Sequence, residues 1–225
     1  MYLPRHFTWT ELAEIESFVD SAGAADLVTF DGTRPVATLL PVIWDRPARP
    51  EPAAGAAAVA DGAEYGRLLG HVAIANLQWQ TAAPGAQALA IVHGPQAYIS
   101  PSWYESKTRH GRVVPTWNYQ TVHLTGSVTF HQDAEWLRTL VSRLTRRHEG
   151  GREHPWAVTD APPEYIDGQL RAIVGVELLI TAVEAKQKLS QNRSEADRAG
   201  VVAGLRSERA AGAAVIAGLM AGQLD

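Results

Sequence analysis

Cysteine is absent from all 225 residues of this chain. The absence excludes disulfides, thiolate metal sites and a cysteine nucleophile. It suits a reducing compartment, so we expect a cytoplasmic protein. Apolar runs of about 18 residues, long enough to span a membrane, are also missing. The first residues, MYLPRHFTWTELAEIESF, lack the apolar run and small-residue cleavage site of a signal peptide.

Positive charge is in slight deficit, because the net charge is -4. This balance argues against broad, non-specific binding of nucleic acid. Several familiar motifs are missing as well: the glycine-rich dinucleotide loop, the P-loop, the paired-histidine zinc motif, the serine nucleophile elbow and a helix-turn-helix. The sequence therefore predicts neither a metal site nor a catalytic motif of these kinds.

Lysine is scarce, since only three of the 20 basic residues are lysines. Two of them, Lys186 and Lys188, stand two positions apart at the end of a predicted strand. The two-residue period of a strand places them on one face, together with Ser190 if the strand continues.

The hydrophobic pattern predicts an α+β protein with hairpin-connected strands. An Asp31-Gly32 turn signal joins the first two strands, and Gly126 is a candidate bend that lets a long strand curl into a barrel. We predict an antiparallel barrel with peripheral helices. The predicted strands are 25–30, 34–44, 65–75, 87–92, 113–130 and 171–185, and the polar stretch 106–111 is expected to form a loop. The predicted helices are 8–20, 134–148 with Asp133 as its cap, 162–170 and a segment from 194 that Ser194 caps.

The predicted domain organisation is simple. Residues 1–193 form one barrel domain, and 194–225 form a C-terminal helical extension. The segment 46–64 is rich in Pro, Ala and Gly without periodicity, which is typical of a variable insertion in a hairpin.

Aromatic residues gather between 93 and 119, where prolines favour extended, kinked backbone over helix. Two interpretations remain open from the residues alone. The rings belong to a β-core at hairpin ends, or they form a platform for a flat ligand with polar edges. The rings are Tyr98, Trp103, Tyr104, Trp117 and Tyr119.

Polar side chains at the predicted strand ends suit a flat cofactor with an anionic tail. Rings stack on the planar part, amides and hydroxyls bind its edge, and His, Lys or Arg meets a phosphate. His71, in the middle of a strand, is either a hydrogen-bonded core residue or a ligand contact. The other groups are Asn76, Trp79, Lys186, Lys188, Gln191, Asn192 and Arg193.

Basic residues also line one face of the predicted helix 134–148. A solvated face near a helix C-terminus explains them, because cations are favoured there. A patch for an anion or a nucleic acid is the alternative. The residues are Arg138, Arg143, Arg146 and Arg147.

A set of long motifs makes the chain similar to a known family. The motifs are GHVAIANLQW (70–79), YISPSWY (98–104), VVPTWNY (113–119), KLSQNR (188–193) and DRAGVVAGL (197–205). Together they resemble the PaiB-type FMN-binding negative transcriptional regulators, in the same order and from residue 1 to about 206. The resemblance implies a split β-barrel of the FMN-binding type, a homodimer with FMN at the subunit interface, and negative regulation of transcription.

The resemblance also implies a set of cofactor-binding residues. One group is expected near the phosphate and the ribityl chain, a second around the isoalloxazine, and a third reaches the cofactor or the partner chain. These groups are, in that order, the segment with Gly70, His71, Ala73, Ala75 and Asn76; Trp103, Thr116, Trp117 and Asn118; and Lys186, Lys188, Gln191 and Asn192. Trp79 belongs to the cofactor-binding set as well, without a stated place around the cofactor.

Two other functions stay open. One is an FMN-dependent oxidoreductase, similar to pyridoxamine phosphate oxidase or flavin reductase, since FMN carries the redox chemistry itself. The other is a haem-binding split barrel with His71, His93 or His123 as the axial ligand. DNA binding is implied by the resemblance only, with the face from Arg138 to Arg147 as the candidate surface.

Overall fold

The computed structural model describes residues 1–46, 65–83 and 85–223. The predicted insertion 46–64 lies outside these residues from position 47 onward. Within the described part, no helix is long and apolar enough to cross a membrane.

The chain divides into two compact units, and several strands run through both. Residues 184–225 form part of the first unit, so the chain on both sides of residue 193 belongs to it. The predicted boundary between 193 and 194 stays a prediction. The first unit is 1–18, 93–122 and 184–225, and the second is 19–92 and 123–183.

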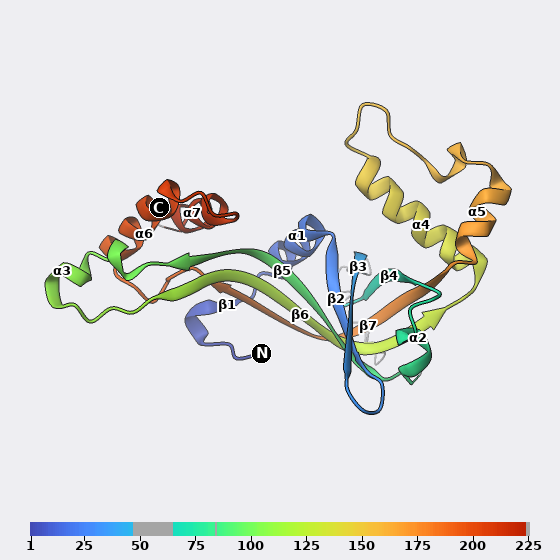
Figure 1. Cartoon of the computed structure of the whole chain (residues 1–225), viewed down its shortest axis with the longest axis horizontal. Coiled ribbons are helices and arrows are strands. Elements are labelled where there is room, and N and C mark those ends of the chain that lie inside the picture. Colours follow the sequence, from blue (N-terminus) through green and yellow to red (C-terminus); the bar gives the residue numbers. More distant parts are fainter. Residues whose placement is uncertain (47–64, 84, 224–225) are drawn as a thin grey trace, which may run out of the picture. The chain divides into compact units, whose positions relative to one another are not determined.

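In the described part of the chain, seven strands form one sheet in the order β1-β7-β4-β3-β2-β5-β6 (Figure 1). The further pairing of β6 with β7 closes a ring of strands. The paired strands of known register are antiparallel, which confirms the predicted antiparallel α+β fold. The strands are β1 (Thr8–Trp9), β2 (Ala24–Phe30), β3 (Pro35–Asp45), β4 (Arg67–Ala73), β5 (Gln87–Ile99), β6 (Thr116–His131) and β7 (Ile173–Lys188).

The predicted helix starts are confirmed at two caps. Asp133 accepts a hydrogen bond from the Trp136 backbone N–H, and Ser194 accepts one from that of Asp197. The helices are α1 (Leu12–Ala22), α2 (Gln78–Thr81), α3 (Ser106–His110), α4 (Ala134–Glu149), α5 (Pro163–Leu170), α6 (Glu195–Ser207) and α7 (Ala213–Ala221), with short 3-10 turns at Arg5–Phe7, Pro101–Trp103 and Val158–Asp160.

Three predictions need correction. The first helix begins at Leu12 and not at residue 8, because Thr8 and Trp9 pair with β7 as strand β1. The expected loop 106–111 contains α3. Strand β5 continues through Pro95 to Ile99. Pro95 lies beyond Ile91, the last residue of β5 that pairs with β2, so it removes no donor from that ladder.

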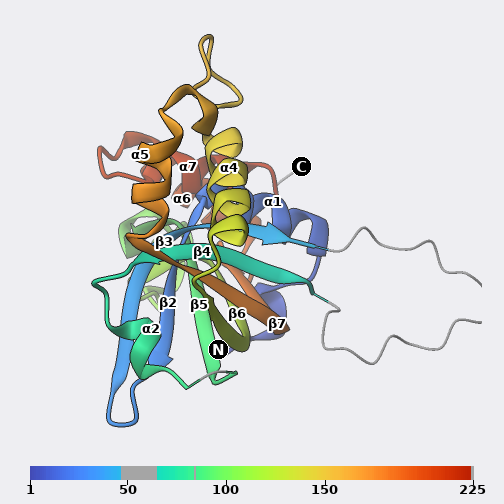
Figure 2. The same ribbon diagram turned by 90° about the vertical axis from the view of Figure 1, so that its right-hand side faces the viewer.

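The second unit contains the closure of the barrel and the helix α4 that packs beside it. Leu140 and Leu144 of α4 form a core cluster with Ile43 and Leu69 of the sheet. Figure 2 shows α4 beside α5, and Arg138 of α4 pairs with Asp167 of α5 at 2.5 Å.

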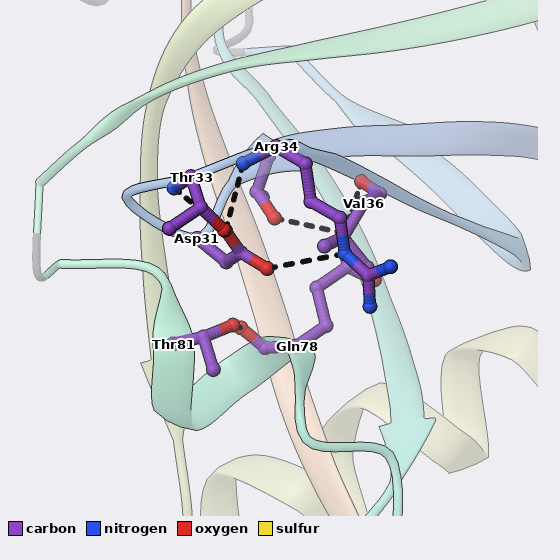
Figure 3. A network of polar contacts seen from close by, with 7 residues as sticks. Asp31, Thr33, Arg34, Val36, Gln78 and Thr81 are labelled. Carbon is purple, nitrogen blue, oxygen red and sulfur yellow. Dashed lines mark hydrogen bonds and ion pairs between the residues drawn. The ribbon is translucent and has the colours of Figure 1, made fainter.

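The predicted hairpin between β2 and β3 is confirmed, and Asp31 organises its turn (Figure 3). One Asp31 carboxylate oxygen accepts hydrogen bonds from the backbone and hydroxyl of Thr33 and from the backbone of Arg34, at 2.7–2.9 Å. The pKa of Asp31 is lowered to about 2. The largest cause is the hydrogen bond from the Thr33 hydroxyl, and the two backbone hydrogen bonds add to it. Beside the turn, the buried Gln78 amide donates to Thr29 and to the carbonyls of Leu27 and Val36.

The first unit has its own core, in which α6 and α7 pack against β5 and the end of β7. The buried side chains include Ile99, Leu189, Val201, Leu205, Ile216 and Met220. Trp103 packs against α6 at Gly200 and Gly204, where added Cβ atoms would lie 2.1 Å from its carbonyl oxygen and 2.3 Å from its ring. Bulkier residues at these two positions would displace Trp103.

The close approach of β6 to β7 at Gly126 gives the first testable prediction. A Cβ at this position would lie 1.9 Å from the carbonyl oxygen of Leu179. We expect Gly126→Ala to lower the free energy of unfolding by about 1–3 kcal/mol, since the backbone of β7 must move. Urea denaturation measures the change.

The control is Gly218→Ala in α7, where no atom lies within 4 Å of the added Cβ. This substitution should be neutral or stabilise the helix by up to about 1 kcal/mol. Equal stabilities of the two variants would contradict the close approach.

Candidate functional site

The predicted cofactor-binding residues fall in both units, and each group is described by itself. The second unit holds His71, Ala73, Asn76 and Trp79, and the first holds Trp103, Thr116, Trp117, Asn118, Lys186, Lys188, Gln191 and Asn192. Strand β7 continues to Lys188, so Lys186 and Lys188 lie on one strand face as predicted.

Lys188 is a half-buried cation at the end of β7. Its ammonium donates to the Thr116 hydroxyl at 2.6 Å and to the Trp117 carbonyl at 2.5 Å, and it lies 5.8 Å from the centre of the Phe7 ring. Burial lowers the pKa of Lys188 from its usual value, and the charges of Lys186 and Arg193 lower it further. Two other cations, Lys186 and Arg193, therefore lie close enough to affect Lys188.

Lys186 is more deeply buried, with 6% of its surface exposed. Its ammonium donates to the Tyr2 carbonyl at 3.0 Å and lies 5.5 Å from the ring centres of both Tyr2 and Tyr119. In the described part of the chain, neither Lys186 nor Lys188 forms an ion pair with a carboxylate. A buried charge without a counter-ion is costly, so this pair favours an anionic ligand.

Asn118 lies in the core of the first unit and is fully buried. Its amide nitrogen donates to the Ser190 hydroxyl at 3.0 Å and lies 3.4 Å from the Met220 sulfur. Ser190 is unusual because its φ of 63° lies in the left-handed region. Asn118 therefore holds the turn that follows Lys188.

The two predicted glutamine and asparagine contacts belong to the same turn. The Gln191 side chain accepts a hydrogen bond from the Leu189 backbone at 2.8 Å and donates to the Gln187 carbonyl at 2.7 Å. Asn192 is exposed. Gln191 thus closes the turn, while Asn192 presents its amide to the surface.

The aromatic residues divide between the two interpretations left open by the sequence. Trp103 packs on α6 and Tyr104 is buried, so both serve the core. Trp117 and Tyr98 are about half exposed and meet edge to face at 6.2 Å, and the Trp117 ring N–H donates to Gln96. The exposed pair is the part of the stretch that a flat ligand can reach.

His71 stands on β4 opposite Gly175 of β7 in the second unit. Its Nδ1 atom is buried and has no hydrogen-bond partner in the described part of the chain. Burial lowers the pKa of His71, so its ring is neutral near pH 7. A neutral ring offers one donor and one acceptor rather than a positive charge.

The neighbours of His71 hold the segment after β4. The Asn76 amide donates to the Thr38 hydroxyl at 2.8 Å and accepts from the Gln78 backbone at 3.0 Å. The Trp79 ring N–H donates to the Ile74 carbonyl at 3.0 Å. Ala73 is exposed at the end of β4. These contacts fix the loop.

The other two candidates for a haem ligand, His93 and His123, each have an interaction partner. His93 belongs to the first unit and His123 to the second. In the described residues, no three His, Asp or Glu side chains are grouped to hold a metal ion.

A family model described as "Putative FMN-binding domain" matches residues 1–182. The protease synthase and sporulation protein PAI 2 of Bacillus subtilis (strain 168) is 33% identical over 224 residues, which cover 100% of this chain and 98% of that protein. The chain belongs to the PaiB-type FMN-binding family. This confirms the resemblance and FMN as the cofactor.

Solved structures agree with the fold of this PaiB-type protein. An FAD- and haem-binding protein from Mycobacterium smegmatis has a TM-score of 0.55 at 16% identity, covering 91% of this chain and 82% of that one. The flavocytochrome Anf3 of Azotobacter vinelandii has a TM-score of 0.53 at 12% identity, covering 83% and 72%. The split-barrel fold is thereby confirmed.

The residues of the first unit fit the phosphate of FMN. An ammonium has three N–H donors, and the bonds to Tyr2, Thr116 and Trp117 leave at least one donor on each lysine of the PaiB-type chain. Three residues near the two lysines and the turn after them are absent from the predicted cofactor-binding set: Phe7, Tyr104 and Ser190. The sequence pointed to two of them, because Ser190 lies in the motif 188–193 and Tyr104 lies in the aromatic stretch.

The Asn118–Ser190 contact gives a stability prediction. Asn118→Ala removes the partner of a buried hydroxyl, so we expect a loss of about 1–3 kcal/mol in the free energy of unfolding. Asn192→Ala, at an exposed position of the same turn, should change it by less than about 0.5 kcal/mol. Thermal and urea unfolding measure both, and a loss confined to Asn192→Ala would contradict the assignment.

Proposed function

We propose that this PaiB-type protein is a homodimeric, FMN-binding regulator that represses transcription, with FMN at the subunit interface. The observation that carries the cofactor part is the lysine pair of the first unit. Lys186 is buried and Lys188 half-buried, and neither has a carboxylate partner in the described residues.

In this proposal the two lysines bind the phosphate. Lys188 is the more accessible of the two, and the Thr116 hydroxyl and Trp117 carbonyl orient its ammonium. A charge-assisted bond to a phosphate oxygen is stronger than a neutral one. Bound FMN would supply an isoalloxazine ring able to accept and donate electrons.

The remaining predicted residues stack on the cofactor or hold the backbone around the site. Trp117 offers an exposed ring for stacking, while Asn118 and Gln191 hold the turn after Lys188 and Asn192 lies at its surface. Trp103 acts through its packing on α6. For the second unit we propose His71 as a neutral hydrogen-bonding group, with Asn76 and Trp79 fixing the loop after Ala73.

Flavin affinity tests the cofactor assignment. We expect Lys188→Ala to weaken FMN binding by about 1.5–3 kcal/mol, since a charged hydrogen bond is lost. His71→Ala should cost less, about 0.5–1.5 kcal/mol, because the ring is neutral. Flavin fluorescence titration gives both values. Unchanged affinity in both variants would refute the assignment and leave the fold intact.

The pH dependence of the same affinity supplies the control. The folded-state pKa of Lys188 is below its usual value of 10.5, so FMN affinity should fall as pH rises through that lowered pKa. Below that pKa the Lys188 ammonium is charged, and its contribution to FMN affinity is fully present. Lys188→Arg keeps its charge at all these pH values and should lose this decline.

The arginine face of α4 is the candidate DNA surface, and three of its four arginines are already paired. Arg143 and Arg147 form ion pairs with Asp45 and Asp20 at 2.8 and 3.0 Å, and Arg138 pairs with Asp167. Arg146 is exposed and joins no ion pair in the described residues. We therefore propose weak DNA contacts that centre on Arg146.

An electrophoretic shift assay tests whether the protein binds DNA directly. We expect a shift with genomic fragments at about 50 mM salt that weakens strongly by about 200 mM. Arg146→Gln should weaken it further, whereas Arg206→Gln, an exposed position on α6, should not. No shift of holo or apo protein at either salt concentration would exclude direct DNA binding.

A haem barrel is the second candidate, and one observation favours it. The M. smegmatis protein of similar fold binds FAD and haem, and the unpartnered Nδ1 of His71 is a possible axial ligand. The absorption spectrum of the purified protein distinguishes flavin bands from a Soret band.

A further inference from the structure

The family match ends at residue 182, but the cations nearest the proposed phosphate all follow it. Lys186, Lys188 and Arg193 lie in a segment that belongs to the same compact unit as residues 93–122. The segment from 184 to 225 is therefore more than an appendage, because it carries the positive charge of this unit's candidate site.

Arg193 has an unusual position for a guanidinium. Its central carbon lies 4.9 Å from the centre of the Tyr104 ring, a cation–π contact. Its charge contributes to the lowered pKa of Lys188. In the described residues, Arg193 forms no ion pair with a carboxylate.

One carboxylate that the Arg193 charge influences is held by hydrogen bonds to α3. Asp197 is 4% exposed, and its two oxygens accept hydrogen bonds from the backbone N–H and the hydroxyl of Ser106 at 2.8 and 2.9 Å. Burial alone would raise the pKa of Asp197, but these bonds and the Arg193 charge lower it. Asp197 thus ties α6 to α3 and leaves the charge of Arg193 without an ion-pair partner.

Tyr104 supports Arg193 in this position. The Tyr104 side chain is 2% exposed and belongs to the core of the first unit. Burial raises the pKa of Tyr104, while the interactions of its hydroxyl with Arg193 and Ser190 act in the opposite direction. The buried Tyr104 ring and the turn at Ser190 therefore both lie next to the Arg193 guanidinium.

We propose that Arg193 is the third cation of the phosphate site, positioned by the Tyr104 ring and by the turn at Ser190. The segment after residue 182 then completes the cofactor site of the FMN-binding domain. This inference rests on the proposed function and adds its ligand specificity. Three cations suit a phosphomonoester dianion, whereas riboflavin, which has no phosphate, gains nothing from them.

Paired titrations with FMN and riboflavin on the full chain test the inference. We expect Arg193→Gln to weaken FMN binding about 10-fold or more and to leave riboflavin binding unchanged. Arg193→Lys should recover part of the FMN affinity, since the charge remains. Arg206→Gln removes one exposed charge from α6 and should alter neither ligand. Inorganic phosphate should compete with FMN on the wild type and compete less on Arg193→Gln.

The outcomes separate the two proposals. FMN binding by the wild type with no change in Arg193→Gln overturns the role of Arg193 alone. An equal loss of FMN and riboflavin affinity in Arg193→Gln would show that Arg193 only supports the fold. This result also overturns its role in phosphate binding. A folded wild type that binds neither flavin overturns the proposed function itself.

Discussion

Unbalanced positive charge in the first unit is the constraint on which the proposed function depends. The two-residue period of β7 keeps Lys186 and Lys188 on one face of the strand, where Lys186 is buried and Lys188 is half-buried. Carbonyls, a hydroxyl and aromatic rings satisfy part of each ammonium, but none of these groups neutralises a charge. An anionic ligand supplies what the described residues lack.

The C-terminal helices matter because they fix the backbone that carries these cations. Asn118 reaches Ser190 on one side and Met220 of α7 on the other, so α7 and the turn share one buried contact. Asp197 ties the start of α6 to Ser106. Trp103 fills the space left by two glycines of α6. A cation cluster on a loose turn would rearrange; on this support it keeps its geometry.

Local sequence signals predicted much of the fold. The Asp-Gly turn, the caps at Asp133 and Ser194, and the alternation of β7 each reflect interactions within a few residues. The failures share a different cause. Thr8 and Trp9 became a strand through pairing with residues about 180 positions away, and neither the packing of Trp103 nor the burial of Asn118 leaves a mark on nearby sequence. The site residues stay a prediction, and the part that each would play depends on such long-range contacts.

The arginines of α4 show how the same residue type serves a different end. Arg138, Arg143 and Arg147 each meet an aspartate from a distant part of the second unit, so their charge is balanced within the protein. Lys186, Lys188 and Arg193 of the first unit form no such ion pair with a carboxylate in the described residues. A ligand that binds only the folded chain stabilises it by an amount that grows with the logarithm of the ligand concentration above its Kd. An anion bound here would act directly on the turn and helices at the C-terminus. Cofactor occupancy would thereby change the stability of one defined segment, which is the physical requirement for a flavin-responsive regulator.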